Sequence, residues 1–372
     1  MAPQPPDAIS AHGLCADQAR WRDGFARLLY GPVPAAPSKV HVAMAPVDGE
    51  PCRRLTITIE TAKGAHAVDA ALWLPDVPRP VPLVIGLSFL GPAGVLMGSA
   101  FPIDPRMIVD ADPALGLVNG APSPRMRGRH AARWPVSRFM AHGVGLLLAP
   151  YGSFVPDCAE RWQSRGLAPL LGTGVPRPGA ISLWAWSLSR LVDAALMLPQ
   201  VDPVRIAVAG HSRLGKAALW AAANDSRISA AIVNNAGCGG TAMAAISRGE
   251  SLGAMAARYP HWGAEGLAGD PDRVRRAGLD QQHLIAAVAP RQVIVGSAAA
   301  DAWADPAAEY AAICAAAPAW GVAFPPSPAV FAEPRTTTLA LTRGGLAWHL
   351  RPGDHALMPE DWRHYLAAFT GS

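Results

Sequence analysis

The sequence predicts an α/β fold, in which a mostly parallel central sheet carries helices on both of its faces. Short, uninterrupted apolar runs rich in β-branched residues are typical of parallel strands buried on both faces. They lie at 82–89, 144–150, 204–209, 229–233 and 292–296. Helical patterns come between and after these runs, at 180–198, 213–224 and 359–369. Strands that alternate with helices in this way form one parallel sheet between two helical layers.

The segments that precede these strands have a different pattern. Residues 52–60 and 66–74 alternate apolar and polar side chains with a period of two, which predicts a half-buried antiparallel pair. We expect residues 1–50 to form an N-terminal extension packed on the core, and residues 51–372 to form a single domain. The stretch 91–138, rich in Gly, Pro and Arg, is too long for an ordinary connection, so we expect it to lie over one end of the sheet.

Composition excludes several classes of protein. Hydrophobic residues make up 51% of the 372 residues and charged residues 16%, the opposite of the balance found in disordered chains. The net charge is +4 without a dense basic run, so we expect no nucleic-acid partner. Five cysteines without a Cys-x-x-Cys pair disfavour a disulfide scaffold and a zinc site. The uncharged stretch 81–103 contains prolines, which favours a strand and a buried loop over a membrane helix.

A candidate nucleophile lies in the motif GHSRLGK (210–216), where a predicted strand ends and a predicted helix begins. A serine on such a turn has a strained backbone and an exposed hydroxyl, and the following amide points at a developing oxyanion. Ser212 has this position. The glycine usually found two residues later is replaced by Leu214, with Gly215 one place further on. A helix N-cap is the alternative role for Ser212, because the same position favours it.

A serine nucleophile needs a base and an orienting acid, and in this type of fold the chain order is Ser, Asp or Glu, His. His355 lies in a loop between a strand-like run and the last helix, whereas His349 lies within the run and His364 within the helix. We therefore expect His355 to be the base, with an ordinary loop histidine as the alternative. Asp301 follows the strand 292–296 and is the expected acid, because Asp305 precedes a proline as a helix N-cap does.

Several ordered blocks occur along the chain: GLSFLG (86–91), RWP (133–135), WAWSLSR (184–190), GHSRLGKAALW (210–220), NAGCGG (235–240), RGE (248–250), HW (261–262), APR (289–291) and DAWADP (301–306). Together these blocks resemble the bacterial glucuronoyl esterases of carbohydrate esterase family 15. The resemblance runs from about residue 50 to the C-terminus. It implies an α/β-hydrolase fold, a serine triad and no metal or other cofactor. It also implies cleavage of the ester between 4-O-methylglucuronic acid of xylan and lignin alcohols.

The resemblance also implies roles for single residues. Carried over by position, they are Ser212 as nucleophile, His355 as base, Arg213 as oxyanion stabiliser, and Lys216, Glu250 and Trp303 as sugar-binding residues. Considered alone, Lys216 is also compatible with a solvated helix face, Glu250 with a surface charge and Trp303 with the core. These alternatives stay open at this point.

The chain departs from the family pattern at several places. Some members carry the triad acid where this chain has Asn235, so the acid role rests on Asp301. Fungal members pair two cysteines at positions that are His211 and Ala356 here, which fits the bacterial branch. The family stretch Asp-Gln-His appears here as Asp280-Gln281-Gln282, so a glutamine replaces the histidine. The departures leave the hydrolase interpretation in place and the preferred substrate open.

We therefore expect a serine carboxylester hydrolase whose substrate is a glucuronoxylan or lignin–carbohydrate ester. The alternatives are an esterase of other specificity, acting on acetylxylan or simple aryl and alkyl esters, and a catalytically silent carbohydrate-binding scaffold. We expect a monomer without a membrane partner. The resemblance implies a secreted or periplasmic protein. Residues 1–6 lack the pattern of a signal peptide, so a cytoplasmic site stays open.

Overall fold

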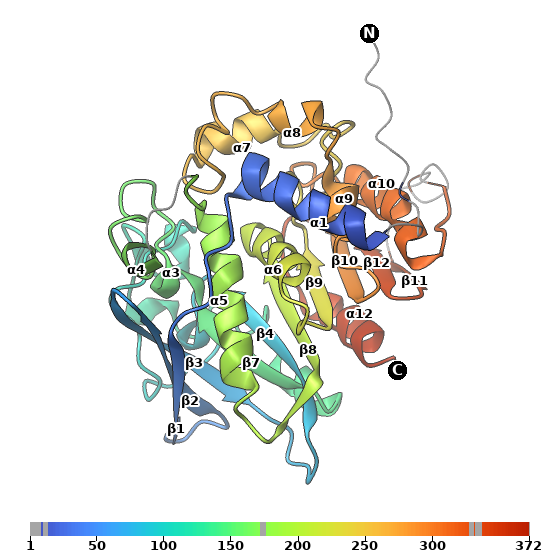
Figure 1. Cartoon of the computed structure of the whole chain (residues 1–372). Coiled ribbons are helices and arrows are strands. Elements are labelled where there is room, and N and C mark those ends of the chain that lie inside the picture. Colours follow the sequence, from blue (N-terminus) through green and yellow to red (C-terminus); the bar gives the residue numbers. More distant parts are fainter. Residues whose placement is uncertain (1–8, 10–13, 172–175, 327–330, 332–336, 372) are drawn as a thin grey trace.

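Ten strands form one twisted sheet in the computed structural model of the chain (Figure 1). The structure describes residues 9, 14–171, 176–326, 331 and 337–371. Across the sheet the strands are β1 (Lys39–Pro46), β2 (Arg53–Thr61), β3 (Gly64–Trp73), β7 (Gly145–Pro150), β4 (Val81–Ser88), β8 (Val201–His211), β9 (Ala230–Asn234), β10 (Gln292–Ala298), β12 (Leu346–Arg351) and β11 (Leu339–Arg343). A separate two-stranded sheet contains β5 (Leu117–Val118) and β6 (Ala121–Pro122).

The pairing confirms the predicted mixture of strand directions. Strands β7, β4, β8, β9, β10 and β12 pair in parallel, and the five predicted buried strands are all among them. The predicted antiparallel pair is β2 with β3. The edge strands β1 and β11 were not predicted; both pair antiparallel with their neighbours. The described part of the expected extension at residues 1–50 includes β1, which belongs to the main sheet. The boundary at residue 50 stays a prediction.

Helices occur along the whole chain. The α-helices are α1 (Leu14–Phe25), α2 (Val136–Ala141), α3 (Tyr151–Phe154), α4 (Ala168–Leu171), α5 (Ala180–Ala195), α6 (Arg213–Asn224), α7 (Leu252–Arg258), α8 (Arg273–Arg276), α9 (Gln281–Ala286), α10 (Pro306–Ala316) and α12 (Pro359–Thr370). Shorter turns of π- or 3₁₀-helix are η1 (Ala26–Tyr30), η2 (Pro92–Gly94), η3 (Pro113–Leu115), η4 (Pro124–Met126) and η5 (Ala317–Trp320). The three predicted helices are α5, α6 and α12.

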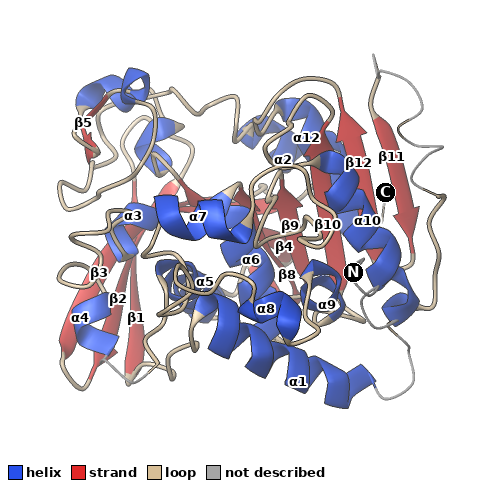
Figure 2. Ribbon diagram, turned by 90° about the horizontal axis from the view of Figure 1, so that it is seen from above, coloured by secondary structure: helices blue, strands red, loops and turns tan. Residues whose placement is uncertain are grey.

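Helices cover both faces of the sheet, as Figure 2 shows from above. Successive side chains of a strand point to opposite faces. Ile206 and Val208 of β8 therefore pack into the core beneath α5, α6 and α9, whereas Ala207 and Ala209 pack into the core beneath α2 and α12. The predicted three-layer arrangement is thus confirmed, and a central strand needs apolar residues wherever helices cover both of its faces.

The long stretch 91–138 lies at the carboxyl end of β4 and β7, as predicted. The amide of Ile108 donates a hydrogen bond to the carbonyl of Gly152, just beyond β7, at 3.3 Å. A Cβ on Gly91 would come within 2.7 Å of Pro150, the last residue of β7. The stretch therefore packs closely on the sheet edge where parallel α/β folds place their functional loops.

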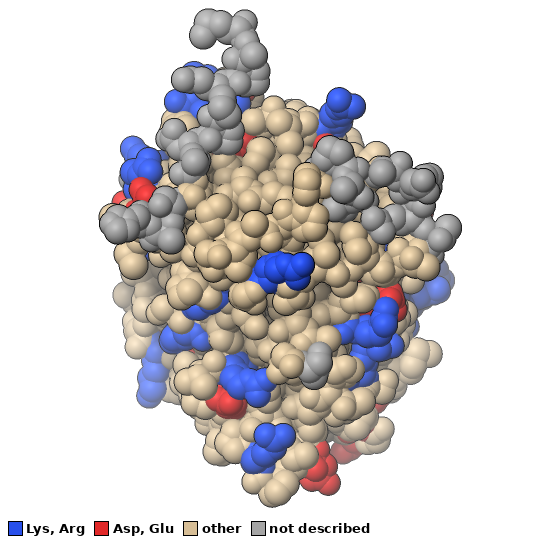
Figure 3. Space-filling model, turned by 90° about the vertical axis from the view of Figure 1, so that its right-hand side faces the viewer, with Lys and Arg blue, Asp and Glu red and all other residues tan. Residues whose placement is uncertain are grey.

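The uncharged stretch 81–103 forms β4 and the mostly buried loop after it, as predicted. Within the described ranges, none of the helices is long and apolar enough to cross a membrane. The first six residues, which lack a signal-peptide pattern, lie outside the described ranges. On the face in Figure 3, charged side chains are scattered among uncharged ones, consistent with a charged content of 16%.

Candidate active site

Ser212 occupies a sharp turn between β8 and α6. Its φ is 58° and its ψ is −126°, a strained conformation for a residue other than glycine. A Cβ on Gly210 would lie 2.0 Å from the carbonyl oxygen of Leu214, and one on Gly215 would lie 3.1 Å from that of Gly210. The glycine at 215 therefore serves the close approach of strand and helix, and Leu214 is tolerated. The Ser212 side chain makes no capping hydrogen bond to α6.

His355 and Asp301 are joined by a short hydrogen bond. The Nδ1 atom of His355 lies 2.6 Å from Oδ2 of Asp301. The two residues follow β12 and β10, which are neighbours in the sheet, so the topology brings them together. Burial alone would raise the pKa of the Asp301 carboxyl, but the bond from His355 and its charge outweigh burial and hold this pKa below its usual range. Asp301 is therefore ionised at neutral pH and can orient the imidazole.

Asn235 follows β9 and contacts the same carboxylate. Its Nδ2 donates to Oδ2 of Asp301 at 2.6 Å, and its backbone amide donates to the carbonyl of Gly296 at 2.8 Å. The amide of Ala304 donates to the other carboxylate oxygen of Asp301 at 3.0 Å. The position that carries an acid in some relatives thus supplies a hydrogen-bond donor to Asp301.

The other candidate residues have different partners. Nε2 of His349 lies 2.7 Å from Asp361 in the core, and Nε2 of His364 lies 3.3 Å from Glu360 on α12. Asp305 caps α10 through its side chain, which confirms the role predicted for it. Asp301 and His355 are thus the acid and histidine that the structure brings together beside Ser212.

One pocket of about 340 Å³ collects the predicted site residues. Its lining includes Ser212, Arg213, Lys216, Glu250, Trp303 and His355, and Asp301 lies behind His355. Among the described residues, no hydrogen bond joins Ser212 to His355. Such bonds are often long in a free enzyme and shorten when substrate binds. For the same ranges, no cluster of His, Cys, Asp and Glu side chains is arranged to hold a metal ion.

The guanidinium of Arg213 is held between aromatic rings at the pocket wall. Its Cζ lies 4.5 Å from the ring centre of Trp262, 5.1 Å from that of Tyr259 and 5.5 Å from that of Phe89. Its Nη1 donates to the buried carboxylate of Asp157. Among the described residues, its buried Nε has no hydrogen-bond partner, so the ion pair with Asp157 and the aromatic rings hold the guanidinium in place.

The environments of the three residues predicted to bind sugar exclude the other roles considered for them, which are a solvated helix face, a surface charge and a core residue. Lys216 is 4% exposed, and its ammonium donates to the carbonyls of Ala236 and Cys238, so it is not a solvated helix lysine. Glu250 is 5% exposed and is not a surface charge. Trp303 is 52% exposed at the pocket, so it is not a core residue, and its carbonyl accepts the amide of Glu250 at 3.0 Å.

Comparison with known proteins places this site in a family. The family model described as "Glucuronyl esterase, fungi" matches residues 172–323. A protein named "Carbohydrate esterase MZ0003", from an unknown prokaryotic organism, is 30% identical over 321 residues, which cover 84% of this chain and 73% of that protein. The chain belongs to carbohydrate esterase family 15. It is a serine-type carboxylic ester hydrolase.

Two solved structures of family 15 are closely similar. A promiscuous family 15 esterase from a marine bacterial metagenome superposes with a TM-score of 0.82 at 28% identity, covering 95% of this chain and 90% of that one. A glucuronoyl esterase from Solibacter usitatus superposes with a TM-score of 0.80 at 28% identity, covering 95% and 91%. This likeness confirms the α/β-hydrolase fold implied by the resemblance.

Several pocket residues of this family 15 member were not predicted. Tyr259 stacks on Trp262 with ring centres 3.7 Å apart and an angle of 6°, and both line the pocket with Arg258. The block at 258–262 is basic and aromatic, a signal that could have identified it. His211 packs against His355 with ring centres 4.6 Å apart, although the sequence marks His211 only as the replacement of a fungal cysteine.

Proposed function

We propose that the chain is a glucuronoyl esterase that hydrolyses the ester between (4-O-methyl-)glucuronic acid of glucuronoxylan and lignin alcohols. The observation that carries the proposal is the hydrogen-bonded His355–Asp301 pair, 2.6 Å apart, beside the pocket that Ser212 lines. Membership of family 15 and the likeness to the Solibacter usitatus glucuronoyl esterase support the substrate class.

The reaction begins with attack on the ester carbonyl. His355 takes the proton of the Ser212 hydroxyl through Nε2, while its Nδ1 stays bonded to Asp301. The Ser212 oxygen then bonds to the C6 carbonyl carbon, and a tetrahedral oxyanion forms. The Arg213 amide is available to this oxyanion because it is the first of α6, and the first amides of a helix lack intrahelical partners. The Arg213 side chain adds a charge that does not titrate, and the loop 86–91 adds a further donor.

The alcohol leaves in the second half of the reaction. His355 returns its proton to the alcohol oxygen as the carbon–oxygen bond breaks, which leaves a glucuronoyl ester on Ser212. Water then repeats the sequence: His355 takes its proton, hydroxide adds to the carbonyl, and the Ser212 oxygen leaves with the proton. The products are the uronic acid and the free alcohol.

Three side chains recognise the sugar. Glu250 accepts hydrogen bonds from sugar hydroxyls, Lys216 donates to them, and the exposed ring of Trp303 covers the sugar face. Their place in the lining of the Ser212 pocket supports these roles. We further propose that the protein acts as a monomer outside the cytoplasm, where its polymeric substrate is found, and needs neither metal nor other cofactor.

A broader esterase activity is the second candidate. It is favoured by the TM-score of 0.82 to a structure described as a promiscuous family 15 esterase. The same Ser212, His355 and Asp301 would act on acetyl or aryl esters, and only the sugar-binding residues would lose their importance.

Hydrolysis of benzyl glucuronate and of p-nitrophenyl acetate, with the intact protein and with Ser212→Ala, tests the proposal. We expect turnover of the glucuronate ester that is lost in the variant. Activity on the acetate alone would support the broader esterase and refute the uronate assignment. Activity on neither ester, with no labelling of Ser212 by a covalent serine probe, would support the silent scaffold.

A further inference from the structure

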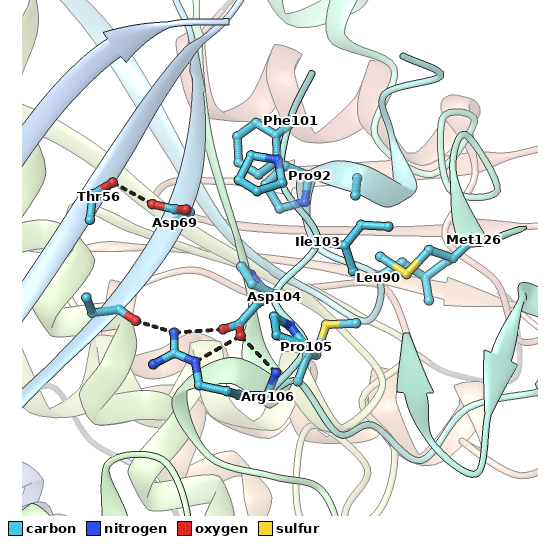
Figure 4. Close-up of a pocket in the computed structure, with 16 residues that line it drawn as sticks. Thr56, Asp69, Leu90, Pro92, Phe101, Ile103, Asp104, Pro105, Arg106 and Met126 are labelled. Carbon is cyan, nitrogen blue, oxygen red and sulfur yellow. Dashed lines mark hydrogen bonds and ion pairs between the residues drawn. The ribbon is translucent and has the colours of Figure 1, made fainter. Parts of the chain in front are cut away.

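A second pocket lies next to the active site, on the other side of the loop after β4. Leu90, Gly91 and Pro92 of this loop line the second pocket, whereas the preceding residue, Phe89, packs against Arg213. The cavity has a volume of about 270 Å³ (Figure 4). A single loop therefore separates two hollows at the same edge of the sheet.

One wall of the second pocket is polar, and its groups are held in place. The hydroxyl of Thr56 on β2 donates to Oδ1 of Asp69 on β3 at 2.5 Å. Arg106 donates hydrogen bonds to the Asp104 carboxylate from Nε at 2.9 Å and from Nη2 at 3.0 Å. Its Nη2 also donates to the carbonyl of Ala67 at 2.7 Å. The hydrogen bonds of these described residues leave Oδ2 of Asp69 as an acceptor and Nη1 of Arg106 as a donor.

The opposite wall is apolar. In Figure 4, Leu90, Ile103 and Met126 lie across the cavity from the Thr56–Asp69 pair. Phe101 and Pro92 border the cavity on a third side, and the Phe101 side chain is 2% exposed. Rigid apolar surface thus faces an oriented acceptor and an oriented donor, the combination by which binding pockets fix small molecules.

These features select one class of ligand. The volume is just below the range of about 300–1,000 Å³ that suits drug-sized molecules, so it suits a single ring. An anion would meet the carboxylates of Asp69 and Asp104 against the one guanidinium of Arg106. A purely apolar ring would leave the Asp69 acceptor unpaired, which is costly. A phenol has one hydroxyl, whereas a sugar has several that both donate and accept, together with apolar C–H faces.

We propose that this second pocket binds one neutral pyranose unit, with its hydroxyls on Asp69 and Arg106 and its C–H face on the apolar wall that contains Leu90. Because a single loop separates it from the Ser212 pocket, the unit belongs to the polysaccharide that carries the ester. This last point rests on the proposed function. The pocket then adds affinity for a polymeric substrate without touching the reacting ester.

Two variants and a control test the proposal. Asp69→Asn removes the charged acceptor but keeps the shape of the side chain, and Ala67→Leu fills the pocket without removing a hydrogen bond. Asp76→Asn changes an exposed aspartate that does not line the pocket. Calorimetric titration of the intact proteins with xylotetraose is expected to show at least a tenfold rise in Kd for both pocket variants and no change for the control.

Kinetics of the same proteins separate this proposal from the proposed function. We expect both pocket variants to keep the wild-type KM for benzyl glucuronate, which has no second sugar, and to raise KM for an ester carried on glucuronoxylan. Wild-type Kd values in both variants, or saturable binding of guaiacol without binding of xylotetraose, would overturn the pocket proposal. Xylotetraose binding that depends on Asp69, without hydrolysis of benzyl glucuronate, would refute the proposed function and support the sugar pocket.

Discussion

The guanidinium of Arg213 forms an ion pair with the carboxylate of Asp157, whose side chain is wholly buried. The same carboxylate accepts hydrogen bonds from Tyr151 at 2.7 Å, His261 at 2.8 Å and Trp262 at 2.9 Å. Burial alone would raise the pKa of Asp157, but the Arg213 charge and these bonds hold it well below its usual range. Asp157 therefore stays ionised and positions Arg213 at the pocket wall.

Asp157→Asn is expected to lower kcat/KM for benzyl glucuronate by about 10- to 100-fold, because Arg213 loses the partner that orients it towards the oxyanion. Breaking a buried pair also costs about 3–5 kcal/mol of unfolding free energy, measurable by urea denaturation. Asp110→Asn is the matched control, since Asp110 lies 3.2 Å from the same Nη1 but is 51% exposed. Equal losses in the two variants would contradict the positioning role of Asp157.

The fold is predictable from the sequence where burial is complete. Each central strand contains a short apolar run where helices cover both of its faces, and this signal identifies β4, β7, β8, β9 and β10. Strand β11 (Leu339–Arg343) has no buried residue and β1 (Lys39–Pro46) has one, so neither edge strand carries a comparable pattern. Their places depend on pairing with distant partners, which local periodicity does not encode.

The site is predictable where chemistry imposes a motif or a chain order, as at Ser212 and His355. Asp157 and His261 could not be predicted as partners, because they are 104 residues apart and meet only through the packing of two loops. The departure at Gln282 finds no explanation: its buried amide has no hydrogen-bond partner in the part of the chain that the structure describes, and it does not line the active-site pocket.

A carboxylate returned to position 235 is expected to rescue the loss of Asp301. Asp301→Asn gives His355 the wrong hydrogen-bond partner and is expected to lower kcat by about 10³- to 10⁴-fold. Asn235→Asp added to that variant is expected to raise kcat again by at least about tenfold, because Nδ2 of Asn235 lies 2.6 Å from Oδ2 of Asp301. The φ of residue 235 is 45°, a conformation that aspartate adopts as asparagine does. Asn235→Ala in the same background is the control, and an equal recovery there would rule out the carboxylate as the cause.

Glu250→Ala is expected to raise KM for benzyl glucuronate by about 10- to 100-fold, because a hydrogen bond to a charged group contributes about 1.5–3 kcal/mol. Turnover of p-nitrophenyl acetate is expected to change little, and equal losses on both esters would contradict sugar binding. Burial raises the pKa of the Glu250 carboxyl. The wild-type KM for the glucuronate ester should therefore rise as the pH falls through this raised pKa, whereas the KM of Glu250→Gln should not.

His130 is expected to make the fold sensitive to acid. Both of its ring nitrogens are buried and have no hydrogen-bond partner among the described residues, and burial, with the nearby Arg133, lowers its pKa from 6.5 to about 3. Below pH 6.5 the unfolded chain binds a proton that the folded chain does not, so this group removes about 1.4 kcal/mol of stability per pH unit as the pH falls towards 3. Below that pH the loss is complete and stays constant.

Urea denaturation between pH 8 and pH 4 measures this slope. Both His130→Leu and His130→Gln remove the titrating group, so the unfolding free energy of each variant is expected to decline less steeply with falling pH than that of the wild type. Two variants of different polarity separate the titration from a change in packing, since packing alters the free energy equally at every pH. Parallel curves for the wild type and both variants would show that His130 is not the source of the acid sensitivity.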